Sequence, residues 1–118
     1  MKTIGEIFGL SLILLSSICT PHFSDLYECY IITDVEVSDY QENDYEQVDC
    51  EEFMAIIAKA KLAHTTFAVD KEANLYDDEG VRYKLYISRN CRYFRIDSNY
   101  FLLQKRYARR LKALIGSA

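Results

Sequence analysis

The clearest pattern in this chain is an alternation of apolar and polar residues in its second half. Between residues 81 and 87 the apolar positions are Val81, Tyr83, Leu85 and Ile87. This period of two is typical of a half-buried strand. Turn-like residues at 89–90 and 97–99 then separate two further apolar runs. We therefore expect strands near 92–96 and 100–103, which continue the first strand as a meander.

The first half is less regular. Apolar and acidic residues alternate from Tyr27 to Val37, which predicts a strand, although Tyr30 and Ile32 interrupt the alternation. An acidic connector follows at 38–49. Asp49 precedes Glu52 by three residues, in front of apolar residues at helical spacing, which is typical of a helix N-terminus. We expect a helix from about 50 to 63 and a short strand at 65–69.

From residue 104 the pattern is that of an amphipathic helix that ends at Gly116. The element order is then β-α-β-β-β-β-α. This order predicts a single α+β domain at 20–118, with a small antiparallel sheet and two helices packed on one face.

Residues 1–19 have the organisation of a cleavable signal peptide. Lys2 precedes an apolar stretch at 7–18, and the small residues Ser17 and Cys19 suit a cut before Thr20. We therefore expect a secreted or periplasmic protein. Alternatively, the segment 15–19 resembles the lipobox of bacterial lipoproteins, although Ile18 departs from that pattern, and a retained leader or lipid on Cys19 would anchor the chain to a membrane.

Three cysteines remain after such a cut, namely Cys29, Cys50 and Cys91. In an oxidising compartment they allow one intramolecular disulfide and one leftover thiol. The sequence leaves open which two pair, and it also leaves open that all three are buried free thiols.

Charge is distributed unevenly along the chain. Residues 20–58 contain eleven Asp or Glu and no Lys or Arg, whereas residues 59–118 contain thirteen Lys or Arg and six acids. Such asymmetry indicates either a charged partner or mutual neutralisation of the two halves within the fold.

The acidic connector is the strongest candidate for a contact surface. Its tyrosines offer rigid contact area, and its carboxylates accelerate association with a cationic partner. We expect the partner-binding residues to be Asp39, Tyr40, Glu42, Asp44, Tyr45 and Glu46. The alternative is a solvated acidic loop without a partner.

Catalytic and cofactor signals are weak. Cys50 begins a predicted helix, but the acids beside it counteract the helix dipole and raise the pKa of its thiol. His64 stands alone at a predicted helix end, and an acid pair such as Asp77 and Asp78 lacks a recognisable cleft. No segment has metal-ligand spacing or a phosphate-binding glycine pattern. The sequence predicts neither an enzyme nor a cofactor.

Five basic residues on the closing helix could face nucleic acid or anionic lipid. The overall acidity and the lack of another basic cluster in the sequence argue against nucleic acid. The sequence therefore predicts a small exported protein that binds a basic protein by occlusion, as an inhibitor or immunity protein does. The alternative is an envelope-associated accessory protein or lipoprotein without enzymatic activity.

Overall fold

The computed structural model describes residues 20–116, so the predicted leader lies outside the described residues. Within this range the chain forms one seven-stranded antiparallel sheet and three α-helices, which confirms the α+β class. The strands are β1 (Ile32–Asp39), β2 (Glu46–Val48), β3 (Lys61–Ala63), β4 (Val69–Asp77), β5 (Arg82–Ser88), β6 (Tyr93–Ile96) and β7 (Asn99–Leu102). The helices are α2 (Phe23–Leu26), α3 (Cys50–Ile57) and α4 (Lys105–Gly116), and a 3-10 turn covers Cys29–Ile31.

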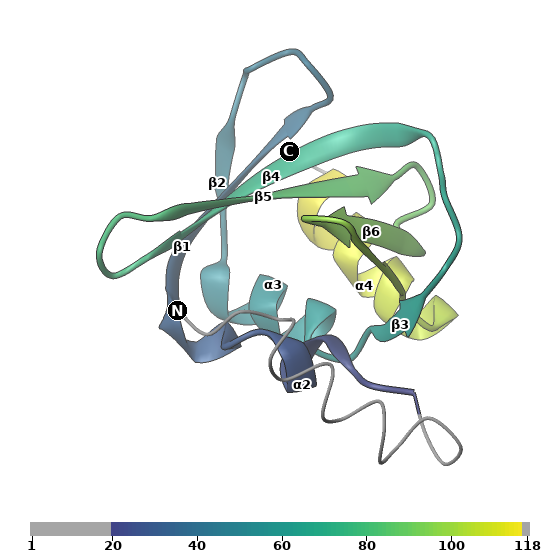
Figure 1. Ribbon diagram of the computed structural model, residues 1–118. Coiled ribbons are helices and arrows are strands. Elements are labelled where there is room, and N and C mark those ends of the chain that lie inside the picture. The colour runs from purple at the N-terminus through teal and green to yellow at the C-terminus, as the bar shows by residue number, and fades with distance from the viewer. Residues whose placement is uncertain (1–19, 117–118) are drawn as a thin grey trace.

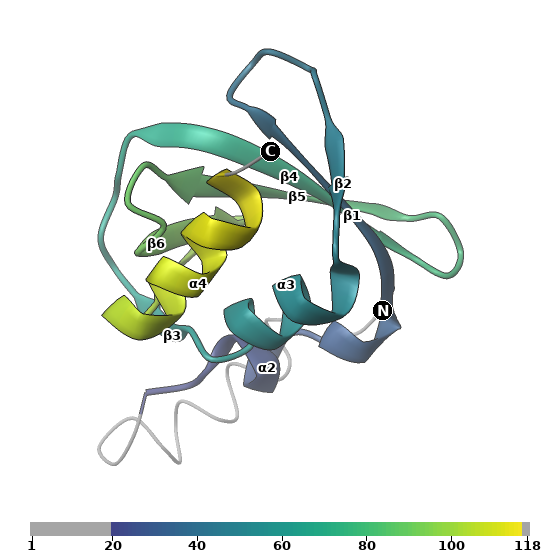
Figure 2. The ribbon, with the colours of Figure 1, turned by 180° about the vertical axis from the view of Figure 1, so that it is seen from behind.

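The sheet has the strand order β2-β1-β4-β5-β6-β7-β3 and curves around α3 and α4 (Figures 1 and 2). Alternate strand residues point to the inside of this curve, where they form the core with the apolar residues of the helices. Fully buried members of that core are Val35, Leu75, Leu85, Ile87, Phe94 and Phe101 from the sheet, and Phe53, Ile56, Leu111 and Ile115 from the helices. We call the opposite face, turned away from α3 and α4, the outer face.

The meander and the closing helix agree with the sequence analysis. The strands expected at 81–87, 92–96 and 100–103 are β5, β6 and β7, and the closing helix expected from residue 104 is α4, which covers the described residues Lys105–Gly116. Regular alternation places Leu85 and Ile87 in the core, while Arg82 and Lys84 extend to the outer face. Period and turn chemistry are both local properties, which is why the sequence was sufficient here.

Three strands of the structure, β2, β3 and β4, have no counterpart in the expected order. β4 is the longest strand and lies in the middle of the sheet, between β1 and β5. Its alternation is short: Ala73 and Leu75 lie in the core, while the outer-face residues Glu72 and Asn74 are polar and yet buried. β2 lies inside the expected acidic connector and pairs with β1 through only three residue pairs. The order is therefore β-β-α-β-β-β-β-β-α after the short N-terminal helix α2.

The helix expected at 50–63 ends at Ile57, and the next residues form β3 instead. Leu62 pairs with Phe101 of β7, and its N–H donates to the carbonyl of Pro21 at 2.9 Å. These tertiary hydrogen bonds outweigh the local helix propensity of an alanine- and lysine-rich segment. The strand expected at 65–69 is absent, because only Val69 of that run belongs to a strand.

The strand expected at 27–37 begins only at Ile32. Before it, α2 buries Phe23 and Leu26, and the Phe23 ring stacks on Tyr27 with centroids 4.7 Å apart. The interruption of alternation at Tyr30 and Ile32 therefore marks the boundary between the 3-10 turn and the strand.

Candidate protein-binding surface

The loop that joins β1 to β2, residues 40–45, carries the centre of the predicted acidic surface. Gln41 and Asn43 have left-handed backbone conformations, with φ of 66° and 55°. The Tyr40 N–H donates to the Asp70 carbonyl at 2.9 Å, and the Glu42 N–H donates to the Asp39 carbonyl at 3.1 Å. These contacts give the loop a defined path over the end of β4.

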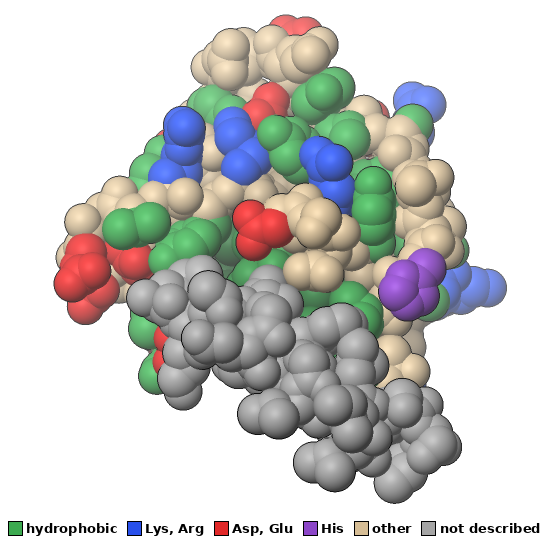
Figure 3. Space-filling view, viewed as in Figure 1, with side chains coloured by type: hydrophobic (Ala, Val, Ile, Leu, Met, Phe, Trp, Pro, Cys, Tyr) green, Lys and Arg blue, Asp and Glu red, His purple; other side chains and the backbone are tan. Residues whose placement is uncertain are grey.

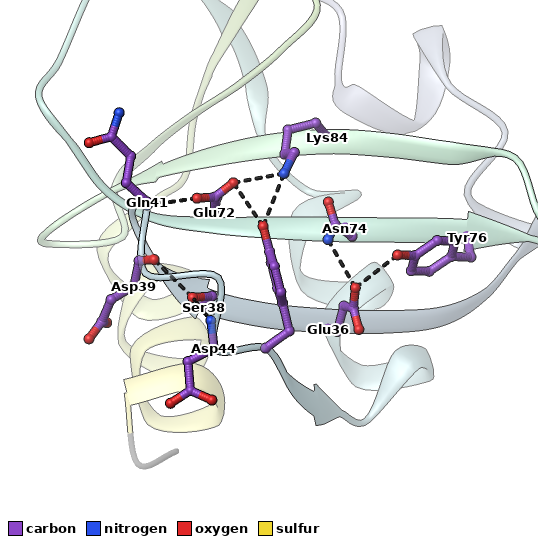
Figure 4. A network of polar contacts seen from close by, with 10 residues as sticks. Glu36, Ser38, Asp39, Gln41, Asp44, Glu72, Asn74, Tyr76 and Lys84 are labelled. Carbon is purple, nitrogen blue, oxygen red and sulfur yellow. Dashed lines mark hydrogen bonds and ion pairs between the residues drawn. The ribbon is translucent and has the colours of Figure 1, made fainter.

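Glu72 of β4 fastens this loop to the outer face. Its carboxylate accepts from the Gln41 N–H at 2.8 Å, from the Tyr45 hydroxyl at 3.0 Å and from the Lys84 ammonium at 2.7 Å (Figure 4). Burial alone would raise the pKa of Glu72, but the hydrogen bonds from Lys84, Gln41 and Tyr45 lower it below its usual value. Glu72 therefore lies ionised beneath the loop at neutral pH.

A second set of contacts orders the other side of the loop. The Ser38 hydroxyl accepts from the Asp44 N–H at 3.0 Å and donates to the Asp39 carbonyl at 2.9 Å (Figure 4). Ser38 is only 3% exposed. The loop is thus held by both Ser38 and Glu72, which lie opposite each other on β1 and β4, and this order reduces the conformational entropy that the loop would lose on binding a partner.

The four predicted carboxylates surround one polar pocket of about 100 Å³ at the end of α4. It is lined by Asp39, Glu42, Asp44 and Glu46, together with Val37, Ser38, Lys71 and Ile115. All four acids are exposed. Lys71 forms an ion pair with Asp39. Among residues 20–116, the other three acids have no Lys or Arg within ion-pair distance.

The two predicted tyrosines lie apart from the carboxylates. Tyr45 turns to the outer face, where its hydroxyl contacts Glu72 and Lys84. Tyr40 packs edge-on against Tyr86, with ring centroids 6.1 Å apart, and remains 40% exposed. The structure therefore brings together four of the six predicted residues and gives Tyr45 a role in holding the loop.

The acidic and basic halves of the chain are joined by few ion pairs. Of the eleven acids at 20–58, Asp39 alone pairs with a Lys or Arg in the described part of the chain. The outer face bears its own Lys and Arg side chains over β4 and β5, while acidic side chains gather at the β4–β5 turn (Figure 3). Direct pairing therefore leaves most of the acidic charge unneutralised.

The three cysteines considered in the sequence analysis are partly or fully buried. Burial raises the pKa of the Cys29 and Cys91 thiols to about 11. Burial, followed by the charges of Asp34 and Asp49, also raises the pKa of Cys50, which confirms the expected effect of neighbouring acids. All three cysteines are free thiols in the structure.

Asp77 lies at the β4–β5 turn, and His64 follows β3. The Asp77 carboxylate organises the β4–β5 turn by accepting from the Glu79 and Val81 N–H groups, each at 2.9 Å. Asp78 is exposed beside it, and His64 is exposed after β3. Within residues 20–116, no three His, Cys, Asp or Glu side chains are placed to hold a metal ion.

Sequence reasoning missed Glu72, Lys71 and Lys84, the residues that shape the acidic loop. The signal for them is the alternation of Glu72 and Asn74 with Ala73 and Leu75. This alternation defines a strand whose polar face is covered, because Tyr45 comes from a distant part of the chain to lie over it.

Comparisons of the chain with protein-family models, curated proteins and solved structures found no match. In the described range 20–116, none of the helices has both the length and the apolar character needed to cross a membrane.

Proposed function

We propose that this protein is a small exported binding protein that blocks a basic protein partner with its acidic β1–β2 loop. The observation that carries the proposal is the convergence of Asp39, Glu42, Asp44 and Glu46 on one solvent-exposed pocket. Carboxylates gathered in this way create a local negative potential, which steers a cationic surface toward the loop.

The pocket suits the head of one lysine or arginine side chain. Its volume of about 100 Å³ is a few times that of a water molecule in the liquid. A guanidinium group forms charge-assisted hydrogen bonds with carboxylates, so an arginine of the partner would contact two or more of these acids at once. Tyr40, half-exposed at the other side of the loop, adds apolar contact area.

The anchoring of the loop also supports a binding role. Glu72 and Ser38 fix the loop backbone before any partner arrives. A pre-ordered loop loses little conformational entropy on association, so more of the contact energy contributes to affinity.

The test compares two variants of equal charge. The loop variant carries Asp39→Asn, Glu42→Gln, Asp44→Asn and Glu46→Gln, and the control carries Glu51→Gln, Glu52→Gln, Asp78→Asn and Glu79→Gln, all exposed acids outside the loop. A partner captured by the wild-type protein should associate with the loop variant roughly tenfold more slowly. The control should keep most of the wild-type rate. Association rates measured at several salt concentrations check this, since electrostatic steering weakens as salt increases.

Two results would contradict the proposal. One is a loop variant that folds and binds at the wild-type rate without salt dependence. The other is equal slowing in both variants, which would show that total charge matters and that the loop does not.

A further inference from the structure

A second charged surface lies between α4 and the β5–β6 turn, away from the acidic loop. One pocket of about 310 Å³ and a neighbouring pocket that shares two of its residues form a continuous groove. The cations that line this groove are Arg89, Arg92, Lys105, Arg109 and Lys112, joined by Asn90. No Asp or Glu lines either pocket.

Three of these cations lie on one side of α4. Lys105, Arg109 and Lys112 are four and three residues apart, so they follow one face of the helix over about 10 Å. Figure 2 shows α4 across the open side of the curved sheet. The sequence showed no second basic cluster beside this helix, but the fold supplies one by placing Arg89 and Arg92 against it.

The turn presents its donors in fixed positions. The Asn90 side-chain oxygen accepts from the Ser88 hydroxyl at 2.8 Å and from the Arg92 N–H at 3.0 Å. Because the side-chain oxygen of Asn90 accepts both bonds, its NH₂ group points away from Ser88 and Arg92. Arg92 Nε donates to the Leu103 carbonyl at 2.9 Å, which orients its guanidinium and leaves the two terminal nitrogens for a ligand.

The groove cations also take no part in the ion pairs of the described residues. Within residues 20–116, none of the five lies within ion-pair distance of a carboxylate. Five like charges along one groove repel one another, and an anion with several charged groups would relieve that repulsion.

Two aromatic rings line one part of the groove. Phe67 and Tyr93 line the second pocket, and their rings stack with centroids 6.4 Å apart. A ligand that joins anionic groups to a ring would therefore meet both cations and an aromatic face.

We propose that this groove binds a small anionic ligand that carries at least two phosphate or sulfate groups. Arg92, Arg109 and Lys112 hold the oxyanions, and Asn90 donates an additional hydrogen bond. This ligand site is separate from the acidic loop, so the proposal does not depend on the partner proposed above.

Binding is tested with inorganic tripolyphosphate and with sucrose octasulfate, by titration calorimetry at about 50 mM salt, where screening of the charges is limited. The groove variant is Arg109→Gln with Lys112→Gln. The matched control is Arg106→Gln with Arg110→Gln, which removes two charges from the same helix outside the groove. Circular dichroism confirms that each variant is folded.

We expect the wild-type protein to bind at least one probe. The groove variant should bind it at least about tenfold more weakly, because two charge-assisted contacts are lost, and the control should change by less than about threefold. The probe that binds more tightly shows whether the groove prefers phosphate groups or sulfate groups.

The proposal is overturned if the wild-type protein binds neither probe, or if both variants weaken binding equally. It is also overturned if a single-stranded oligonucleotide or an anionic vesicle binds while both small probes do not. In that case the groove would serve a macromolecule.

Discussion

Glu72 of β4 joins the β1–β2 loop to β5 through one carboxylate. Its side chain is 7% exposed and receives hydrogen bonds from Gln41 and Tyr45 of the loop and from Lys84 of β5. A buried charge of this kind is costly when its partners are removed, since the remaining group is left without compensation. The order of the acidic loop therefore depends on this residue.

Replacement of Glu72 by Gln should destabilise the protein by about 1–3 kcal/mol, because Lys84 loses its counter-ion and the loop loses a strong acceptor. Urea unfolding measures the free energy of unfolding, and amide exchange of Gln41 should become faster. As a control, Glu79→Gln alters an exposed side chain and should change stability by less than about 0.5 kcal/mol. An unchanged Gln41 exchange rate in Glu72→Gln would argue against anchoring.

The same carboxylate predicts a pH dependence. Since hydrogen bonds outweigh burial and lower the pKa of Glu72, the folded state binds its proton less tightly than the unfolded state. Its contribution to stability is full above the ordinary glutamate pKa of about 4.3 and is lost as the pH falls through the folded-state pKa. Acid titration of stability should therefore be steeper for the wild-type protein than for Glu72→Gln below about pH 5. Parallel titration curves would contradict this.

At the scale of elements, helix α3 begins where the sequence places it and ends early. The Asp49 carboxylate accepts from the Glu52 N–H at 3.0 Å, as an N-cap does. This start is a local signal within four residues. Its end depends on Leu62 pairing with β7, which is a contact with residues about forty positions away that no local pattern encodes.

Asp49→Ala should cost about 0.5–2 kcal/mol of stability through loss of this cap. Glu51→Ala is the control, because Glu51 is exposed in the same turn and caps no N–H in the structure. Chemical denaturation of both variants checks the difference. Equal effects would show that the charge of the first turn matters more than the cap.

The elements that the sequence predicts share one property: the pattern that identifies each of them is complete within a short stretch of neighbouring residues. β5, β6 and β7 combine alternation with turn residues, and α4 has a clear apolar side. β4 was missed because the alternation of Glu72 and Asn74 with Ala73 and Leu75 is short, and the sequence cannot show that Tyr45 and Lys84 contact Glu72. The acidic residues of the candidate surface were found because they lie close together in the sequence, within residues 39–46, whereas the basic groove combines residues 89–92 with residues 105–112 and was not found.

At the scale of the whole molecule, the three cysteines occupy two regions. Cys29 and Cys50 both border Ile32, because the Ile32 N–H donates to the Cys29 carbonyl and the Cys50 thiol donates to the Ile32 carbonyl at 3.3 Å. Cys91 lies in the β5–β6 turn and is 3% exposed. All three are free thiols in the structure, and from the shared neighbour Ile32 we propose Cys29 and Cys50 as the pair for the predicted disulfide.

Intact mass of the exported protein, before and after thiol alkylation, tests both this pair and the predicted leader. We expect a chain that starts at Thr20, a bridge between Cys29 and Cys50, and alkylation of Cys91 only after unfolding, because burial raises its pKa to about 11 and limits access. A bridge that includes Cys91 would contradict the pairing. A mass that retains residues 1–19 or carries acyl chains would instead support the envelope-associated alternative.

The two edge strands of the sheet, β2 and β3, have only three residues each. Such short edges present few unpaired backbone groups, and an isolated bridge between His22 and Lys61 occupies part of the β3 edge. Another chain would find little room to add a strand by backbone hydrogen bonding. The fold therefore resists edge-to-edge aggregation, and partners are left to recognise it through side chains.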